Sequence, residues 1–133
     1  MRAVDANVLL RFVLRDHPDQ SARAALLLAR VEAGEERVYL PEVVVSDTVW
    51  TLHSYYQWPR EHTRDFLTAL LLQPAVHMHD KPRVLRALTL FAEHNVDYSD
   101  ALIAAELADE SMAIYSFDRD FSRLPDVERI EPS

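Results

Sequence analysis

Met1-Arg2-Ala3-Val4-Asp5-Ala6-Asn7-Val8-Leu9-Leu10 is the stretch that decides how the rest of the chain is interpreted. Its first four residues predict a short apolar strand, and an apolar helix begins directly after Asp5. Open α/β sheets place their binding sites at the carboxyl ends of their strands. Asp5 is therefore the first candidate for a functional side chain.

Short strands alternate with helices along the rest of the chain. Further strands are predicted at 38–40, 76–79, 112–117 and 127–130. Helices are predicted at 6–15, 19–33, 41–56, 60–72, 81–94 and 100–109. This alternation is typical of a parallel α/β sheet in which helices connect the strands. No linker or repeat interrupts it, so we expect a single domain over residues 1–133.

Composition limits the possible functions. The 133 residues are 49% hydrophobic, which suits one globular domain with a sizeable core. A formal charge of −8 argues against a protein that coats nucleic acid, although it argues less against an enzyme that binds cations. The absence of cysteine excludes disulfides, zinc fingers, iron–sulfur clusters and a thiol nucleophile. No apolar run reaches the length of a membrane span and no cleavable leader is recognisable, so a cytoplasmic protein is expected.

Three further acids occupy settings comparable to that of Asp5. Asp47 falls inside an apolar helical run, Asp100 begins a helix, and Asp118 follows a predicted strand. Because parallel strands end at one shared edge, we expect Asp5 and Asp118 to approach each other. An acid among valines, as at Asp47, is expected to be buried and therefore costly unless a partner or metal is present. For Asp100, a favourable interaction with the helix dipole is a purely structural alternative.

Carboxylates that lie close together cannot all ionise without a cation, so this set of acids indicates a divalent metal site. Oxygen ligands favour Mg²⁺ or Mn²⁺, which suit phosphate substrates. The reaction that this chemistry implies is metal-assisted hydrolysis of a phosphodiester.

Four segments together resemble the PIN-domain nucleases, and most closely the VapC-type toxins of bacterial and archaeal toxin–antitoxin pairs. They are Asp5-Ala6-Asn7-Val8-Leu9-Leu10, Leu40-Pro41-Glu42 through Ser46-Asp47-Thr48-Val49-Trp50, Asp97-Tyr98-Ser99-Asp100-Ala101-Leu102-Ile103-Ala104, and Ser116-Phe117-Asp118-Arg119-Asp120-Phe121. The resemblance spans nearly the whole chain. It implies a three-layer α/β/α fold with a short, mostly parallel central sheet.

The resemblance also implies roles for particular residues. Asp5, Asp47, Asp100 and Asp118 would be the catalytic, metal-binding quartet. Asn7 and Ser116 would hydrogen-bond these carboxylates or the substrate, and Asp97 would be a supporting acid near the site. Asp120 is another nearby acid; Asp97 and Asp120 could each substitute for a member of the quartet, although for Asp120 we expect a solvated or capping role.

This chain departs from the family pattern at three positions, where it has Ala6 for Thr or Ser, Asp47 for Glu, and Ser116 for Thr. The shorter side chain of Asp47 could reach a metal through a water.

The activity implied by the resemblance is that of a Mg²⁺- or Mn²⁺-dependent endoribonuclease, the toxin of a type II toxin–antitoxin pair. Its expected partners are an RNA substrate, a cognate VapB-like antitoxin and a second copy of the chain. Arg11 and Arg86 are candidates for contacting RNA phosphates, with surface ion pairing as the alternative for both.

An aromatic cluster, Tyr55, Tyr56 and Trp58 with Trp50 close by, is expected to pack in the core; any exposed part would be a partner surface.

Three other readings compete. A receiver-like phospho-signalling domain would need paired acids after the first strand and a late lysine, whereas Asp5 is unpaired and the only lysine is Lys81. A haloacid-dehalogenase-like phosphatase would need a second Asp at position 7, which is Asn7. A catalytically inactive PIN-fold module that binds RNA or protein remains open.

Overall fold

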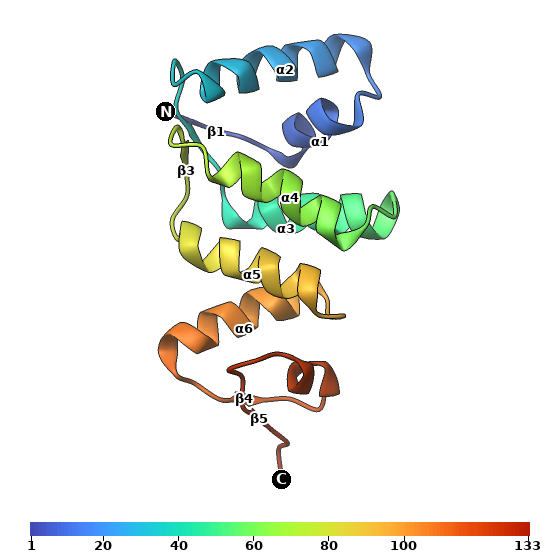
Figure 1. Cartoon of the computed structure of the whole chain (residues 1–133), viewed down its shortest axis with the longest axis vertical. Coiled ribbons are helices and arrows are strands. Elements are labelled where there is room, and N and C mark those ends of the chain that lie inside the picture. Colours follow the sequence, from blue (N-terminus) through green and yellow to red (C-terminus); the bar gives the residue numbers. More distant parts are fainter.

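The computed structural model describes all 133 residues as an elongated α/β molecule (Figure 1). Its five strands are β1 (Arg2–Ala3), β2 (Val38–Tyr39), β3 (Val76–His77), β4 (Ile114–Tyr115) and β5 (Arg129–Ile130). Its helices are α1 (Ala6–Leu14), α2 (Pro18–Glu32), α3 (Glu42–Trp50), α4 (Arg60–Leu71), α5 (Lys81–Glu93) and α6 (Tyr98–Glu110). A π-helix, η1 (Thr51–Tyr55), continues α3, and a 3₁₀ helix, η2 (Arg119–Arg123), separates β4 from β5. The predicted alternation of strands and helices is confirmed.

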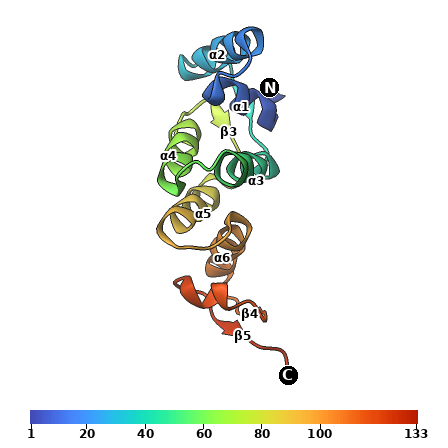
Figure 2. The same ribbon diagram turned by 90° about the vertical axis from the view of Figure 1, so that its right-hand side faces the viewer.

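The strands form two parallel sheets. The first has the order β1-β2-β3, with Arg2 opposite Val38 and Val38 opposite Val76. The second consists of β4 and β5, with Ile114 opposite Arg129. The parallel, mixed α/β class predicted from the sequence is confirmed. However, the five strands do not form one continuous sheet, and the two sheets lie far apart along the long axis (Figures 1 and 2).

The helices stack along the long axis, with α2 at the end beyond the first sheet and α6 next to the second (Figures 1 and 2). α1 packs against α2 and α3, α4 against α5, and α5 against α6, while η2 contacts α6 (Figure 2). One cluster of buried apolar residues runs through this stack, and its largest fully buried side chains include Phe91, Leu9, Leu40, Leu52 and Leu67. No helix combines the length and the hydropathy that a transmembrane span requires.

Helix boundaries follow the capping residues seen in the sequence. Nδ1 of His17 accepts a hydrogen bond from the Gln20 amide, and Pro18 opens α2. Gly34, just past the end of α2, has a φ of 76°, a conformation that is much less strained for glycine than for other residues. Asp80 caps α5 by accepting from the amide of Arg83 at 3.1 Å. These helix ends could be predicted from the sequence because each depends on a residue within a few positions of the end.

The segment that follows Pro41 differs from its prediction. The expected helix over 41–56 is an α-helix only as far as Trp50, and the chain then widens into η1. Val44, Val45, Thr48 and Val49 are buried. Thr48 satisfies its hydroxyl by donating to the carbonyl of Val44 at 2.7 Å. The helical period of 3.6 residues leaves 43, 47 and 50 on the opposite, exposed face.

Candidate metal centre and neighbouring hollows

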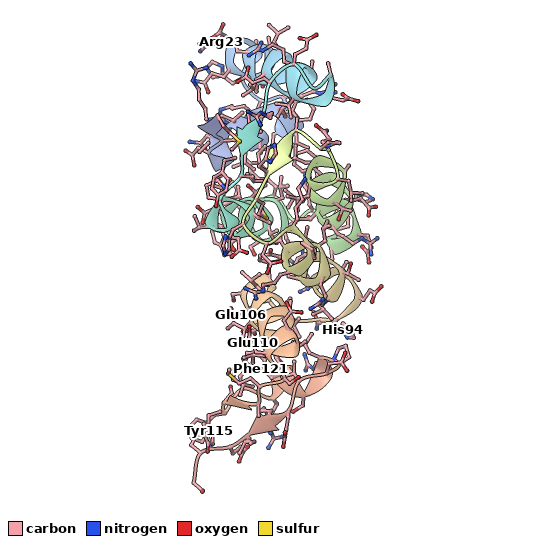
Figure 3. The ribbon with its side chains drawn as sticks, turned by 90° about the vertical axis from the view of Figure 1, so that its left-hand side faces the viewer. Arg23, His94, Glu106, Glu110, Tyr115 and Phe121 are labelled. Carbon is pink, nitrogen blue, oxygen red and sulfur yellow. The ribbon has the colours of Figure 1, made fainter.

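Asp100, Asp118 and Asp120 form a group of acids at the junction of α6 and η2. Each offers a carboxylate oxygen, and these oxygens all lie within 4.8 Å of one another. Asp100 is in the first turn of α6, whereas Asp118 precedes η2 and Asp120 lies in its first turn. Phe121, which is buried, lies beneath α6 and holds η2 against it (Figure 3). Tertiary packing thus brings together acids from two elements.

Local hydrogen bonds fix the loop between β4 and η2. The hydroxyl of Ser116 accepts from the backbone N–H of Asp118 at 2.9 Å. Oδ1 of Asp118 in turn accepts from the N–H of Asp120 at 2.9 Å. Arg129 donates to the carbonyl of Ser116 at 3.0 Å, which connects the loop to β5. The carboxylates of Asp118 and Asp120 are therefore held on a short, braced turn.

The carboxylates of this group repel one another when they are ionised, and the effect is seen at Asp100. Burial raises the pKa of the Asp100 carboxyl, and the nearby carboxylates of Asp118, Asp97 and Asp120 raise it further. One cation offsets part of this, because Arg123 lies 3.2 Å from Asp120. Three oxygen donors without sulfur or imidazole match the preference of Mg²⁺ and Mn²⁺. The donor set therefore fits a hard divalent cation.

Asp5 and Asp47 line a different hollow, of about 340 Å³, together with Asn7 and Trp50. Oδ1 of Asp5 accepts from the Ala6 N–H at 2.8 Å, so this carboxylate caps α1. Asn7 follows in the first turn of α1. This cap explains why an acid lies between β1 and α1, and it engages only one of the two carboxylate oxygens of Asp5.

A second hollow, of about 350 Å³, lies between α3–η1 and the start of α6. Asp47 and Trp50 border it as well, so these two side chains separate the hollow that contains Asp5 from the one that contains Asp97. Asp97 is close enough to Asp100 to raise its pKa. The candidate acids therefore form a series, Asp5, Asp47, Asp97 and Asp100, that leads to the three-acid group.

Comparison with known proteins identifies the family. The family model of the PIN domain matches residues 2–127. The chain belongs to the PIN domain family. This PIN domain is also similar to a protein named VapC ribonuclease from Aquifex aeolicus (strain VF5), with 23% identity over 125 residues that make up 93% of this chain and 92% of the relative. The family resemblance seen in the sequence motifs is thereby confirmed.

The structure of this PIN domain brings the predicted quartet together only in pairs. Asp100 and Asp118 meet, whereas Asp5 and Asp47 share a hollow and belong to no group of three acids that could hold a metal. The expectation that Asp5 and Asp118 approach each other was wrong for this structure, because β1 and β4 belong to separate sheets. The expectation assumed one continuous sheet, which strand patterns alone do not establish.

The predicted burial of Asp47 was also wrong. Asp47 is exposed, since it lies on the face of α3 that carries Val43 and Trp50 rather than on the face that enters the core. Because α3 has apolar side chains on both faces, its sequence pattern did not show which face enters the core. The aromatic cluster is also mostly outside the core: Trp50 and Tyr55 are 63% and 69% exposed, and only Trp58 packs against the core.

Asp120 lies closer to the candidate metal ligands than the preferred interpretation of the sequence placed it. It was named as a nearby acid that could substitute for a ligand, with a solvated or capping role preferred, and its carboxylate lies beside those of Asp100 and Asp118. The available signal was its spacing, two residues after Asp118 in a turn, where an Asp side chain binds the amide two residues on. The hydroxyl of Ser116 accepts from the backbone N–H of Asp118 rather than bonding a carboxylate, so its predicted bond to the acids or the substrate stays a prediction.

The two candidate RNA-binding arginines are engaged within the chain. Arg11 donates to Asp16 at 3.0 Å and to Gln20 at 2.9 Å. Arg86 donates to Asp109 at 2.6 Å and thereby lowers the pKa of that carboxyl. Ion pairing, the alternative considered for both, therefore accounts for their positions, and contact with RNA stays a prediction.

Proposed function

We propose that this PIN domain is a Mg²⁺- or Mn²⁺-dependent endoribonuclease that acts as the toxin of a type II toxin–antitoxin pair. The observation that carries the proposal is the group formed by Asp100, Asp118 and Asp120, whose oxygens lie within 4.8 Å of one another. The similarity to a protein named VapC ribonuclease supports RNA as the substrate. A VapB-like antitoxin, a homodimer and a cytoplasmic location belong to the same proposal.

The three carboxylates would hold the metal. A bound Mg²⁺ or Mn²⁺ lowers the pKa of a coordinated water and stabilises negative charge on phosphate oxygens. Ser116 holds the turn that presents Asp118, through the 2.9 Å bond that it accepts from the Asp118 amide. Asp97 adds negative field at Asp100 and so favours cation binding.

Asp5 and Asp47 keep the metal-binding roles predicted from the sequence as part of this proposal. Their shared hollow, which Asn7 also lines, would position the attacking water, the substrate or a second ion. Asp47 is exposed, and its carboxylate neither caps a helix nor forms an ion pair. It is therefore free to bind a metal ion, a water or the substrate.

Cleavage of RNA by the purified chain tests the proposal. We expect discrete fragments with Mg²⁺ or Mn²⁺, none with EDTA, and loss of at least about 100-fold in rate for Asp118→Asn, because one metal ligand is removed. Asp19→Asn is the matched control, since Asp19 is an exposed acid on α2 paired with Arg23 at 3.0 Å. Equal rates for wild type and Asp118→Asn would refute the proposal.

A catalytically inactive PIN-fold module that binds RNA or protein is the second candidate. The separation of Asp5 from the three-acid group favours it, since the predicted quartet does not form one site here. The receiver-like alternative has less support, because Nζ of Lys81 donates to the carbonyl of Gln73 at 3.1 Å rather than lying at the acids. RNA binding without metal-dependent cleavage would identify the inactive module.

A further inference from the structure

The hollow between α3–η1 and the start of α6 has the features of a base-binding site. It has a volume of about 350 Å³, and its lining includes Asp47, Trp50, His53, Asp97, Tyr98 and Ser99. This volume is near the lower end of the range of small-ligand pockets, so it suits one flat group rather than the side of a helix. None of the residues that line it is used by the three-acid group itself.

Trp50 is the unusual feature of this hollow. Its side chain is 63% exposed, although an indole is among the most favourable groups to bury. It borders both the hollow that contains Asp5 and the one that contains Asp97. An exposed aromatic ring beside a substrate path is the arrangement on which unpaired bases stack.

The carboxylates around Trp50 are pure hydrogen-bond acceptors, and the hydroxyls of Ser46, Ser54, Ser99 and Tyr98 in the same lining can accept or donate. Asp97 is at the start of α6, yet its side chain makes no capping bond there. The Asp47 carboxylate is exposed, and only the backbone carbonyl of Asp47 accepts a bond, from Thr51 at 2.8 Å. Nδ1 of His53 lies 2.8 Å from the carbonyl of Trp58, to which it donates, so this ring edge is already engaged.

Acceptors select among the bases by their edges. Guanine presents adjacent N–H donors, N1–H and the N2 amino group, which one carboxylate can accept together. Cytosine and adenine offer a single amino group, and uracil offers one N–H between two carbonyl oxygens that a carboxylate would repel. In a duplex the Watson–Crick edge of a base is paired and both of its faces are stacked. An unstacked base in a single strand exposes all three.

We propose that this hollow binds one unpaired nucleobase of the RNA substrate, preferably guanine, stacked on Trp50 and hydrogen-bonded by Asp97 or Asp47. The proposal rests on the proposed ribonuclease function, and it names the substrate as single-stranded RNA with a guanine next to the cleaved bond. A base bound in this hollow would lie beside Asp97, which is close enough to Asp100 to raise its pKa. The phosphate next to that base would therefore lie near the three-acid group.

Tryptophan fluorescence tests this inference separately from cleavage. The chain has two tryptophans, so Trp58→Phe leaves Trp50 as the sole reporter. The probes are five-nucleotide RNAs, one with a central guanine among uracils and one of uracil alone, with Ca²⁺ in place of Mg²⁺. We expect the guanine RNA to quench Trp50 fluorescence and to bind about tenfold more tightly, because stacking and paired hydrogen bonds are both gained.

Variants distinguish stacking from structure. Trp50→Ala should weaken binding of the guanine RNA about tenfold, measured by anisotropy of labelled RNA, and Trp50→Phe should recover most of it. Asp97→Asn should reduce the preference for guanine over uracil while leaving stacking in place. Tyr55→Ala is the matched control, because Tyr55 is also an exposed aromatic residue, 69% exposed, and does not line the hollow.

Three results would overturn the inference. They are unchanged Trp50 fluorescence on adding either RNA, equal affinity for the two RNAs, and a Trp50→Ala variant that binds as the wild type does. If metal-dependent cleavage persists in any of these cases, the ribonuclease proposal stands and only the base site fails. Conversely, guanine-selective quenching without any cleavage supports the base site and contradicts the ribonuclease. A fluorescence change that depends on protein concentration and not on RNA would assign Trp50 to a protein interface instead.

Discussion

Asp100 and Asp118 bring their carboxylate oxygens within 4.8 Å of each other, although one belongs to α6 and the other precedes η2. Nothing in the local structure of either element requires this contact. It follows from the packing of η2 on α6, and it places two like charges where only a cation or a proton relieves their repulsion. The consequences of that contact can be measured.

Replacing Asp100 with Asn should stabilise the metal-free protein at neutral pH. The pKa of Asp100 is raised by burial and by its acidic neighbours, so its ionised form costs folding free energy. Since the folded state holds this proton more tightly than the unfolded state, wild-type stability rises as the pH falls through the raised pKa. The difference in Tm between Asp100→Asn and wild type should therefore shrink toward acid pH, as measured by thermal unfolding in EDTA.

Added metal should reverse the order of these two proteins. Mg²⁺ or Mn²⁺ should raise the Tm of the wild type in a concentration-dependent way, since a ligand that binds only the folded state stabilises it. Asp100→Asn should respond much less. A wild type whose Tm is insensitive to millimolar Mn²⁺ would show that the acids hold no metal.

Removing the hydroxyl of Ser116 should loosen the turn that presents Asp118. Ser116→Ala deletes the 2.9 Å bond to the Asp118 amide, at a cost of about 1 kcal/mol in the free energy of unfolding. We expect weaker Mn²⁺ binding by isothermal titration and a lower cleavage rate. Ser116→Thr, which keeps the hydroxyl, should restore both, and failure of that rescue would contradict the positioning role.

Arg60 should be among the most sensitive positions for stability. Its Nη1 donates to the carbonyls of Phe91, His94 and Val96 at 2.9, 3.2 and 2.6 Å, and its guanidinium carbon lies 4.4 Å from the centre of the Phe91 ring. Arg60→Met should cost about 3 kcal/mol in urea unfolding, because part-buried carbonyls lose a charged donor. Arg60→Lys should recover only part, since a lysine lacks the planar fork.

Arg86 offers a test of pH dependence and of RNA contact together. Its hydrogen bond lowers the pKa of Asp109, so the stability it contributes is present above the ordinary carboxyl pKa and is lost as the pH falls through the lowered one. The Arg86→Ala variant should be less stable than wild type at neutral pH, and the two should converge in acid. Unchanged RNA affinity in that variant would remove Arg86 from the candidate RNA contacts.

Much of the site could be identified in the sequence because the signals are local. Asp5 and Asp118 stand out as acids that follow strands, and both in fact cap the helices behind them. The stops at Gly34 and the starts at Pro18 and Asp80 likewise follow from backbone constraints or side-chain bonds within a few residues. Capping and strand–helix alternation depend on neighbours in the chain, so the sequence contains them directly.

The α/β class, the family motifs and the candidate acids follow from local patterns in the sequence. Tertiary packing set which acids meet: Asp120 joins Asp100 and Asp118, while Asp5 lies with Asp47 on another hollow. It also decided that Asp47 and Trp50 face solvent, because burial depends on which helix face meets α1 and α6 rather than on apolar content. Strand pairing and helix orientation are set by contacts between residues far apart in the chain, and a single sequence does not specify these contacts by its local pattern.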